Sequence, residues 1–491
     1  MDKIAEALAE LPSDLITKDQ DIVATYTTDY RQLYTGTTKA LLRPRNTAEV
    51  QQIVRTCVRH GVPIVPQAGN TGYCAGATPS DGGDELVLSL ERMNKVRELD
   101  TANLSITADA GAILSELQQS ASDAGLLFPL SLGSKQSCRI GGNLSTNAGG
   151  ISVLRYGMMR DLVLGLEVVL PDGSLFQDLS PLRKNNAGYD VKQMFIGAEG
   201  TLGVITGASL KLVRKSQQTV TSFLAINDIA DLAYLLDRAQ VQTGESITSF
   251  EYISQKSLAL LMTCRPDLRH PLGQRTSHYV LLEAATASPV LNLQDTVINL
   301  LEDLFEAGKV SDGAVAASEQ QRAEFWQIRE GIPEAEVHHG GSVKHDVAVR
   351  TSQVAGFINS ASQLVQQYAE GAILSIYGHV GDGNVHFNIV PRTDANPVQY
   401  KKWLEREISP RIYHLVADMH GSFSAEYGIG RAKIDLLQRY GDPGKLDLMK
   451  KVKAAFDPNQ SMNPGKVVPG LSRLNDNPDQ VPTSGFQSRQ C

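Results

Sequence analysis

The sequence predicts an α+β protein with more than one domain. Three observations indicate this fold class: glycine-rich loops interleaved with apolar residues up to about residue 215, strands alternating with helices over 216–395, and a mostly helical stretch over 396–457. A chain of 491 residues has room for two or three domains with large cores. Strands and helices mixed in this way favour a domain built on an antiparallel sheet.

The domain boundaries follow from changes in this pattern. A polar run at 214–218 separates the first domain from the alternating region, and the tail is rich in Pro, Asn, Ser and Gln. We expect a first domain over 1–215 with its core at about 40–215, a second over 216–395, a C-terminal helical segment over 396–467, and a tail over 468–491 that forms a surface strap or is disordered.

Charge and cysteine usage narrow the class of protein. The formal net charge of -8 disfavours nucleic acid and anionic membrane surfaces as partners. The five cysteines are scattered without CxxC pairs, which fits a reducing compartment and argues against a cysteine zinc cluster. No apolar run approaches the roughly 18 residues of a membrane span, and no targeting peptide is visible. We expect a cytoplasmic protein, or a mitochondrial-matrix protein if it is eukaryotic and processed, and a homodimer as its assembly.

In the first domain, apolar residues at helical spacing predict a helix over 46–60, capped by Asn46 or Thr47 and ended by Gly61. A second helix is predicted over 113–124. The Asp172-Gly173 turn between two apolar runs indicates a hairpin. The strands predicted for this domain lie at 62–66, 86–90, 163–170, 175–176 and 204–212.

The second domain shows the same two periodicities in alternation. Its predicted strands lie at 220–226, 279–283, 373–377 and 385–390. Its predicted helices lie at 228–239, 291–306 and 353–368.

Three glycine-rich loops carry the strongest functional signal. They lie at 66–77, 131–156 and 197–206, and the second has no acidic residue. Glycines allow close approach of backbone to a ligand, and successive N–H groups with short hydroxyls suit a pyrophosphate. None of the loops has the spacing of a Rossmann turn or a P-loop. A surface linker lacks such apolar interleaving, so the loops predict a dinucleotide held by a different fold.

The motifs PQAGNTGYCAGA, GGNLSTNAGGISVLRYG, LGLEVVLPDG, GYDVKQMFIGAEGTLGVIT and NPGK together resemble FAD-linked oxidoreductases of the vanillyl-alcohol oxidase type. The match is closer to their D-2-hydroxyacid dehydrogenase branch and spans roughly 40–467. The resemblance implies a two-part FAD-binding domain, an antiparallel-sheet substrate (cap) domain, and a C-terminal helical segment that completes the active site and the FAD pocket.

The resemblance also implies which residues hold FAD. The pyrophosphate would lie on the 66–72 and 133–150 loops, with Asn463 reaching back from the C-terminus. Relatives that tether flavin covalently usually do so through a His in the first loop; this loop has none, so we expect non-covalent FAD. The implied cofactor residues are Pro66, Gln67, Ala68, Gly69, Asn70, Thr71, Gly72, Gly76, Pro129, Gly133, Ser134, Ser137, Gly141, Gly142, Thr146, Asn147, Gly149, Gly150, Tyr156, Glu199, Gly203, Ile205 and Asn463.

His379 and His386 lie seven positions apart around a Gly-Asp-Gly-Asn turn, so the two ends of a hairpin can bring both imidazoles together. A lone His pair is often structural. Glu426, in the segment that resembles the family's, would complete a His₂Glu set, which is a catalytic type of zinc arrangement with an open position. The family implies a divalent metal here, zinc or alternatively manganese, that grips the hydroxyl and carboxylate of the substrate.

Substrate contacts implied by the family are Arg329, Lys344, Asn388 and Tyr427. Arg329 and Lys344 could equally be a solvated charge pair, but a cation beyond those needed for one carboxylate favours a dicarboxylate. We expect a D-2-hydroxy acid, with D-2-hydroxyglutarate fitting best and D-lactate or D-malate as alternatives. A base removes the hydroxyl proton, hydride passes to N5 of FAD, and an electron-transfer flavoprotein, a quinone or a cytochrome takes the electrons.

The chain departs from the family pattern near this site. Tyr427 stands where the family has the His expected as base, and an unperturbed tyrosine titrates near pH 10. It can act only if a metal and nearby cations depress its pKa; His345 or a metal-bound hydroxide are the substitutes. Pro333 replaces a usual Thr. Ala348 and Arg350 replace a usual Ser and Pro, and Arg350 is an anion contact or a surface residue.

Three other functions share part of this evidence. A flavin oxidase of alcohols would use the first domain but would not need the His₂Glu set. An NAD-dependent dehydrogenase is disfavoured because the Rossmann turn is missing. A binding or scaffold protein would leave three glycine-rich loops unexplained.

Overall fold

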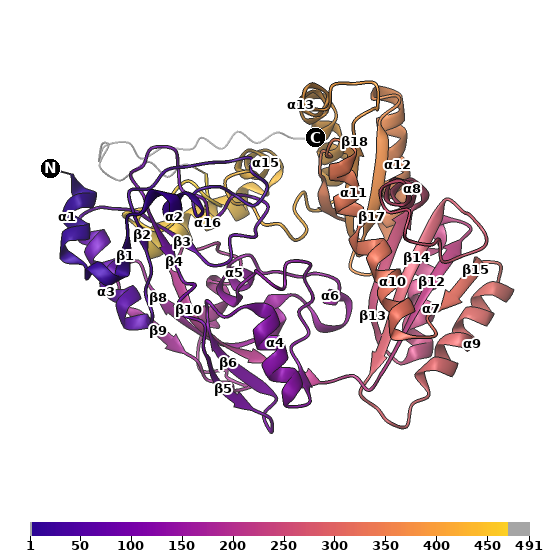
Figure 1. Ribbon diagram of the computed structural model, residues 1–491, viewed down its shortest axis with the longest axis horizontal. Helices are drawn as coiled ribbons and strands as arrows, with labels where there is room; N and C mark the ends of the chain where they lie inside the picture. Colours follow the sequence, from indigo (N-terminus) through magenta and orange to yellow (C-terminus); the bar gives the residue numbers. More distant parts are fainter. Residues whose placement is uncertain (1, 470–491) are drawn as a thin grey trace, which may run out of the picture.

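The chain folds into two lobes, as the computed structural model of residues 2–469 shows (Figure 1). The first lobe contains the N-terminal half and the last helices, and the second contains the middle of the chain. Each lobe has hydrophobic cores of its own. Most of the predicted tail lies outside the described residues. No helix within residues 2–469 is both long enough and apolar enough to cross a membrane.

The first lobe contains two larger sheets with helices around them. A mixed four-stranded sheet has the order β1-β2-β4-β3, and an antiparallel five-stranded sheet has the order β5-β6-β10-β8-β9. The strands are β1 (Ile16–Thr17), β2 (Leu41–Leu42), β3 (Ile64–Gln67), β4 (Leu86–Ser89), β5 (Val96–Asp100), β6 (Ser105–Asp109), β8 (Val163–Val169), β9 (Leu175–Asp178) and β10 (Val204–Lys211), with a small pair, β7 (Leu126–Leu127) and β11 (Val213–Arg214). The helices are α1 (Lys3–Glu10), α2 (Gln20–Ala24), α3 (Thr47–Arg59), α4 (Leu114–Asp123), α5 (Ile140–Ser145) and α6 (Val153–Tyr156).

The predicted helix over 46–60 is confirmed as α3. The Asn46 side chain caps it by accepting from the Glu49 backbone N–H at 3.0 Å, and Gly61 follows it with φ +63°. The predicted hairpin around Asp172-Gly173 is confirmed by the antiparallel pairing of β8 with β9. Strands β5 and β6 were not predicted from the sequence.

The second lobe is built on one antiparallel seven-stranded sheet. Its strand order is β15-β12-β14-β13-β17-β18-β16, which confirms that the second lobe is built on an antiparallel sheet. The strands are β12 (Gln218–Ile226), β13 (Ile247–Ser254), β14 (His278–Thr286), β15 (Val310–Val315), β16 (Asp346–Ala348), β17 (Ile373–Gly378) and β18 (Asn384–Val390).

Helices cover both faces of this sheet, so the second lobe has two cores. One core includes residues of α7 (Leu232–Thr243), α9 (Leu293–Glu306) and α12 (Val354–Tyr368). The other includes residues of α8 (Gln255–Cys264), α10 (Glu319–Glu330) and α11 (Ile332–His338), which the sequence analysis missed.

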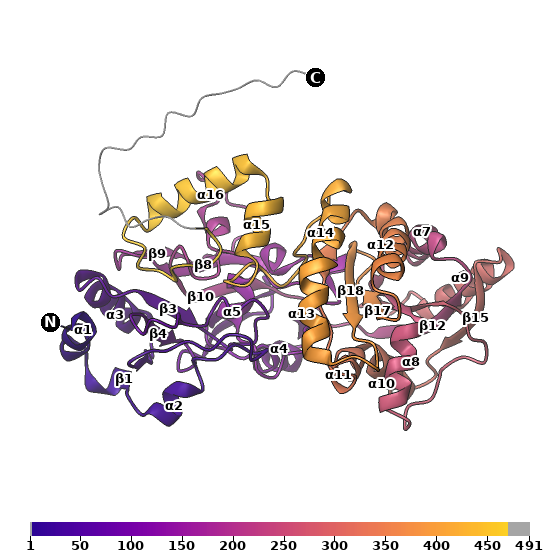
Figure 2. The same ribbon diagram turned by 90° about the horizontal axis from the view of Figure 1, so that it is seen from above.

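The C-terminal segment is shared between the lobes (Figure 2). Helices α13 (Pro397–Glu407) and α14 (Ser409–Asp418) pack on the second lobe, α15 (Ile434–Tyr440) contacts α14, and α16 (Pro443–Phe456) packs on the first lobe. The Phe456 ring meets that of Phe195 edge-on at 5.6 Å between centroids. The loop between α14 and α15 therefore passes from the second lobe to the first, and this loop carries Glu426 and Tyr427.

Candidate functional site

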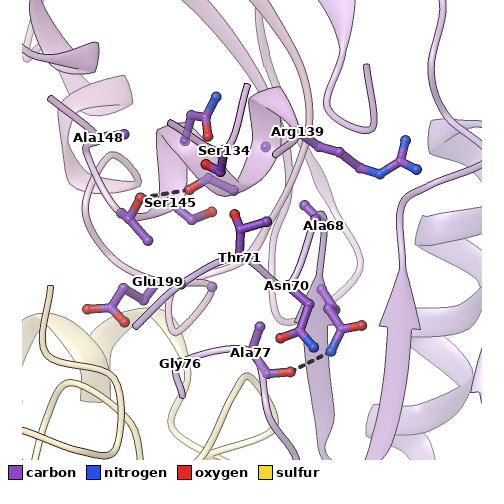
Figure 3. A pocket seen from close by; sticks show the side chains of 18 of the residues that line it. Ala68, Asn70, Thr71, Gly76, Ala77, Ser134, Arg139, Ser145, Ala148 and Glu199 are labelled. Carbon is purple, nitrogen blue, oxygen red and sulfur yellow. Dashed lines mark hydrogen bonds between the residues drawn. The ribbon is translucent and has the colours of Figure 1, made fainter. Parts of the chain in front are cut away.

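A cavity of about 440 Å³ lies where the glycine-rich loops of the first lobe meet (Figure 3). The Gln67 amide at the end of β3 donates to the backbone carbonyls of Tyr26 and Ala77, at 2.9 and 2.8 Å, and so closes the first loop. Gly69 presses against the second loop: a Cβ there would lie 2.6 Å from the carbonyl oxygen of Ser137. Most of the predicted cofactor residues line this cavity: Pro66, Gln67, Ala68, Gly69, Asn70, Thr71, Gly72, Gly76, Gly133, Ser134, Ser137, Gly141, Gly142, Thr146, Gly149, Glu199, Gly203 and Ile205.

Five predicted cofactor residues are not among those lining the cavity: Pro129, Asn147, Gly150, Tyr156 and Asn463. Asn147 accepts from the Arg160 backbone N–H, and Tyr156 lies under the Arg155 guanidinium. Gly150 forms a parallel β-bridge with Ser131, at the start of the second loop. These residues shape the loops.

Asn463 ties two of the loops together. Its Nδ2 donates to the backbone carbonyls of Gly76 and Glu199, each at 2.7 Å. Its Oδ1 is buried and has no hydrogen-bond partner among the described residues. A buried acceptor without a donor is costly, so Asn463 Oδ1 remains able to accept a hydrogen bond. Within the cavity itself, the glycine backbone and the short hydroxyls suit FAD.

The predicted His pair is brought together as expected. His379 follows β17, His386 lies in β18, and the two strands pair antiparallel, which places the imidazole centroids 5.4 Å apart. The Glu426 carboxylate comes from the loop between the lobes, 3.7 Å from His386 Nε2. One ligand atom from each of these three residues lies within 4.8 Å of the others. Glu426 and Tyr427 also line the cavity, so this cluster adjoins it.

The surroundings of the cluster are acidic. Burial lowers the pKa of His379, but the nearby Glu251 and Glu426 carboxylates outweigh it and raise that pKa to about 9. Burial, together with a positive His379, lowers the pKa of His386 well below its usual value, so His386 is a neutral imidazole. Burial raises the pKa of Glu426 to about 7. The cluster therefore favours a positive charge between its ligand atoms.

The predicted substrate cations each have a buried carboxylate partner. Arg329 Nε donates to Glu251 Oε2 at 2.8 Å, and Lys344 Nζ donates to Glu336 Oε2 at 2.7 Å. Asn388 donates to the other oxygen of Glu336 at 2.9 Å. No hydrogen bond to the described residues occupies the terminal nitrogens of Arg329, and Lys344 keeps further donors. Both cations can therefore still bind a carboxylate.

The protein groups around Tyr427 do not by themselves favour its predicted role as base. Burial, followed by the Asp346 and Glu426 carboxylates, raises its pKa well above the usual value near 10, which is the opposite of the required shift. Its ring stacks 6.0 Å from that of His386 and lies 4.7 Å from that of Tyr73. Without a bound cation, Tyr427 is therefore a neutral phenol that shapes the site, and its role as base stays a prediction.

His345, the predicted substitute base, is held by structural hydrogen bonds. It is fully buried, and its two ring nitrogens lie 2.8 Å from the Phe387 carbonyl and 2.8 Å from the Ser409 hydroxyl, so both are used in structural hydrogen bonds. Arg350 is exposed, which makes it a surface residue, and Pro333 lies at the start of α11.

Three carboxylates of the site were missed by the sequence analysis. Glu251, Glu336 and Asp346 are buried and bind the predicted residues: Asp346 accepts from the backbone N–H groups of Glu426 and Tyr427 at 3.1 and 3.2 Å. A carboxylate flanked by aromatic residues, as in ITSFEYIS around Glu251, was the available signal. Such residues are almost never fully buried without a partner.

Comparison with known proteins agrees with this geometry. Residues 38–178 match the FAD binding domain family, and residues 215–467 match the family of FAD linked oxidases, C-terminal domain. The mitochondrial D-2-hydroxyglutarate dehydrogenase of Bos taurus is 35% identical over 468 residues, covering 95% of this chain and 84% of that protein. The D-2-hydroxyglutarate dehydrogenase of Stutzerimonas stutzeri is 35% identical over 456 residues, covering 93% and 96%.

Among solved structures, p-cresol methylhydroxylase superposes with a TM-score of 0.74 at 16% identity, covering 94% of this chain and 96% of that one, which shows a shared fold. The predicted fold class and FAD are thereby confirmed. This chain belongs to the FAD-linked D-2-hydroxyacid dehydrogenases of the vanillyl-alcohol oxidase type, oxidoreductases that act on CH–OH donors.

Proposed function

We propose that the enzyme oxidises D-2-hydroxyglutarate to 2-oxoglutarate with non-covalently bound FAD and a divalent cation, zinc or alternatively manganese. An electron-transfer flavoprotein, a quinone or a cytochrome then takes the electrons. One observation carries the proposal: His379, His386 and Glu426 converge beside the cavity formed by the glycine-rich loops. The names of relatives at 35% identity support the choice of substrate.

The donor set suits zinc or manganese. Two imidazoles and one carboxylate leave an open position, as in catalytic zinc sites. The carboxylates of Glu251, Glu336, Asp346 and Glu426 lie around the hairpin, three of them on buried residues. An anionic substrate enters such a site more readily when a divalent ion supplies positive charge.

The side chains divide the work between binding and orientation. A bound cation supplies a Lewis acid for the hydroxyl and carboxylate of the substrate, and bound FAD supplies the two-electron acceptor. The terminal nitrogens of Arg329 and the ammonium of Lys344 bind the two carboxylates. Asn388, held by Glu336, orients the substrate by a hydrogen bond. Tyr427 and Tyr73 exclude water from one wall of the site.

Non-covalent FAD is supported by the residues of the cavity. No histidine lines it among the described residues. Cys74 does line it, but burial raises the pKa of its thiol to about 12, and its sulfur lies 3.5 Å from the Gly428 carbonyl oxygen. Acid precipitation of the protein should release all the flavin into the supernatant. Flavin that stays with the pellet would contradict this part of the proposal.

Anaerobic reduction of the flavin tests the substrate. The holoenzyme is mixed with D-2-hydroxyglutarate, D-malate, D-lactate or L-2-hydroxyglutarate, and bleaching of the flavin is followed. We expect the D-dicarboxylates to bleach it at lower concentration than D-lactate, and the L-isomer to leave it oxidised. Preference for D-lactate would contradict the dicarboxylate assignment, and no bleaching by any of the hydroxy acids would contradict the proposed reaction.

A further inference from the structure

Glu251 connects His379 of the cluster with Arg329, the predicted substrate cation. It lies within the central strand β13 and is fully buried. Its Oε1 lies 2.7 Å from His379 Nδ1, and its Oε2 accepts from Arg329 Nε at 2.8 Å. Each oxygen of one carboxylate thus holds a different functional residue, one from the hairpin of the cluster and one from α10.

The partner of His379 Nδ1 decides what its other nitrogen can do. A carboxylate can only accept, so Nδ1 keeps its proton, and Nε2 is the nitrogen whose lone pair a cation can take in place of a proton. The outer partner of a metal-binding histidine fixes its tautomer and ring orientation in this way. Arg329 is held through Nε, which leaves its two terminal nitrogens for a substrate carboxylate.

We propose that Glu251 is a positioning residue that fixes the cation ligand His379 and the carboxylate-binding Arg329 relative to each other, so that the hydroxyl end and a carboxylate of the substrate are bound in one geometry. This inference rests on the proposed function, because it assumes a cation between His379, His386 and Glu426. It assigns to Glu251 no contact with substrate or FAD.

Replacement by glutamine tests the need for two acceptors. Both partners present N–H donors, and Glu251→Gln converts one acceptor oxygen into an NH₂ donor. If this NH₂ faces Arg329, two donors oppose each other and Arg329 moves. If it faces His379, the ring must carry its proton on Nε2, which removes the lone pair needed for the cation. Either arrangement therefore disturbs Arg329 or the cation ligand His379.

The neighbouring strand offers a matched control. Glu283 on β14 projects from the same face of the sheet, since Ser249 pairs with Glu283 and Glu251 with Leu281. It binds the same helix α10 through Arg322 Nε and Trp326 Nε1, both at 2.8 Å. Within residues 2–469, the hydrogen-bond partners of its carboxylate are Thr221, Arg322 and Trp326, and none is a histidine. Glu283→Gln therefore disturbs a similar pair without touching the cluster.

The test measures Zn²⁺ affinity and KM separately. Metal-depleted protein that retains FAD is titrated with Zn²⁺ in competition with a chromophoric chelator, and KM and kcat for D-2-hydroxyglutarate are measured on the reloaded enzyme. We expect Glu251→Gln to weaken Zn²⁺ binding by about 10- to 100-fold or, with Zn²⁺ retained, to raise KM by a similar factor. Glu251→Asp, which keeps two acceptors, should lie between wild type and Gln, and Glu283→Gln should stay within about twofold of wild type.

Each other result contradicts a distinct claim. Wild-type Zn²⁺ affinity and KM in Glu251→Gln would overturn the positioning role and leave the proposed function standing. Equal losses in Glu251→Gln and Glu283→Gln would show a general packing effect and also overturn it. A wild-type enzyme that binds neither Zn²⁺ nor Mn²⁺ would overturn the proposed cation, and the positioning role with it.

Discussion

Lys344 has two roles that a methionine substitution can test: it pairs with the buried Glu336 carboxylate, and on the proposed function it binds a substrate carboxylate. The Glu336 side chain is 1% exposed, and that of Lys344 is 17% exposed. Among the described residues, Lys344→Met leaves the Glu336 carboxylate with hydrogen bonds from Ser342 and Asn388 only. The variant therefore loses a buried ion pair and, on the proposed function, one cation of the substrate site.

The two losses have different sizes. Breaking one side of a buried ion pair costs about 3–5 kcal/mol, and we expect about 3 kcal/mol because Lys344 is partly exposed. The lost charge-assisted hydrogen bond to a substrate carboxylate costs about 1.5–3 kcal/mol. That binding loss corresponds to a rise in KM of about 10- to 150-fold for a dicarboxylate.

The double variant Lys344→Met/Glu336→Gln distinguishes the two effects. Removing the unpaired charge should bring the free energy of unfolding back to within about 1 kcal/mol of wild type. The glutamine can still accept from Asn388, so that residue stays in place. KM for D-2-hydroxyglutarate should nevertheless remain high. Chemical denaturation of the holoenzyme and anaerobic flavin reduction measure the two quantities.

One result would refute this reasoning. If the double variant regains both wild-type stability and wild-type KM, Lys344 serves only to neutralise Glu336 and binds no carboxylate. Lys344→Arg keeps the positive charge as a control and should retain most of the stability.

Three further predictions follow from burial and sterics. Tyr427→Phe should lower the rate of anaerobic flavin reduction by less than about tenfold, because loss of a catalytic base costs about 10²–10⁴-fold. A drop of that larger size at full FAD content would show that Tyr427 is the base. Burial lowers the pKa of His345 to about 4, so below pH 6.5 the unfolded state binds a proton that the folded state does not. About 3 kcal/mol of stability is therefore lost as pH falls from 6.5 towards 4. The dependence of the free energy of unfolding on pH should flatten in His345→Gln, and an unchanged dependence would contradict this. In Gly430→Ala the new Cβ would clash with the Cys74 carbonyl oxygen at a φ of +51°, so the loop carrying Glu426 must shift and metal content should fall. Gly244→Ala is the control: it has a similar φ of +58°, but its Cβ meets no atom of the described residues within 4 Å, so metal content should stay.

The sequence pattern predicted that His379 and His386 lie together, because the short turn between their strands sets the distance between the two side chains. A turn between two short strands forces His379 and His386 together whatever surrounds them. Glu426 is more than thirty positions away, and only the resemblance pointed to it. The loop between the lobes brings it to the pair, and no periodicity predicts such a crossing.

The partners of the predicted residues could not be found in this way. Strand β13 is buried along its whole length, so it lacks the alternation that marks a half-buried strand, and Glu251 was missed with it. Glu336 meets Lys344 after α11 has ended at His338, so helical spacing does not relate the two residues. Glycine-rich motifs predicted which loops form the cavity. They did not predict which side chains face it, because residues such as Asn147, at φ +49°, turn away to shape the loop.

Removal and return of metal tests the central claim most directly. The holoenzyme is treated with a chelator until elemental analysis finds no divalent metal, and its reduction by D-2-hydroxyglutarate is followed without oxygen before and after Zn²⁺ or Mn²⁺ is added. We predict that reduction stops on depletion while FAD stays bound, and that one of the two ions restores it. An unchanged rate of flavin reduction in fully depleted enzyme would contradict a cation held by His379, His386 and Glu426.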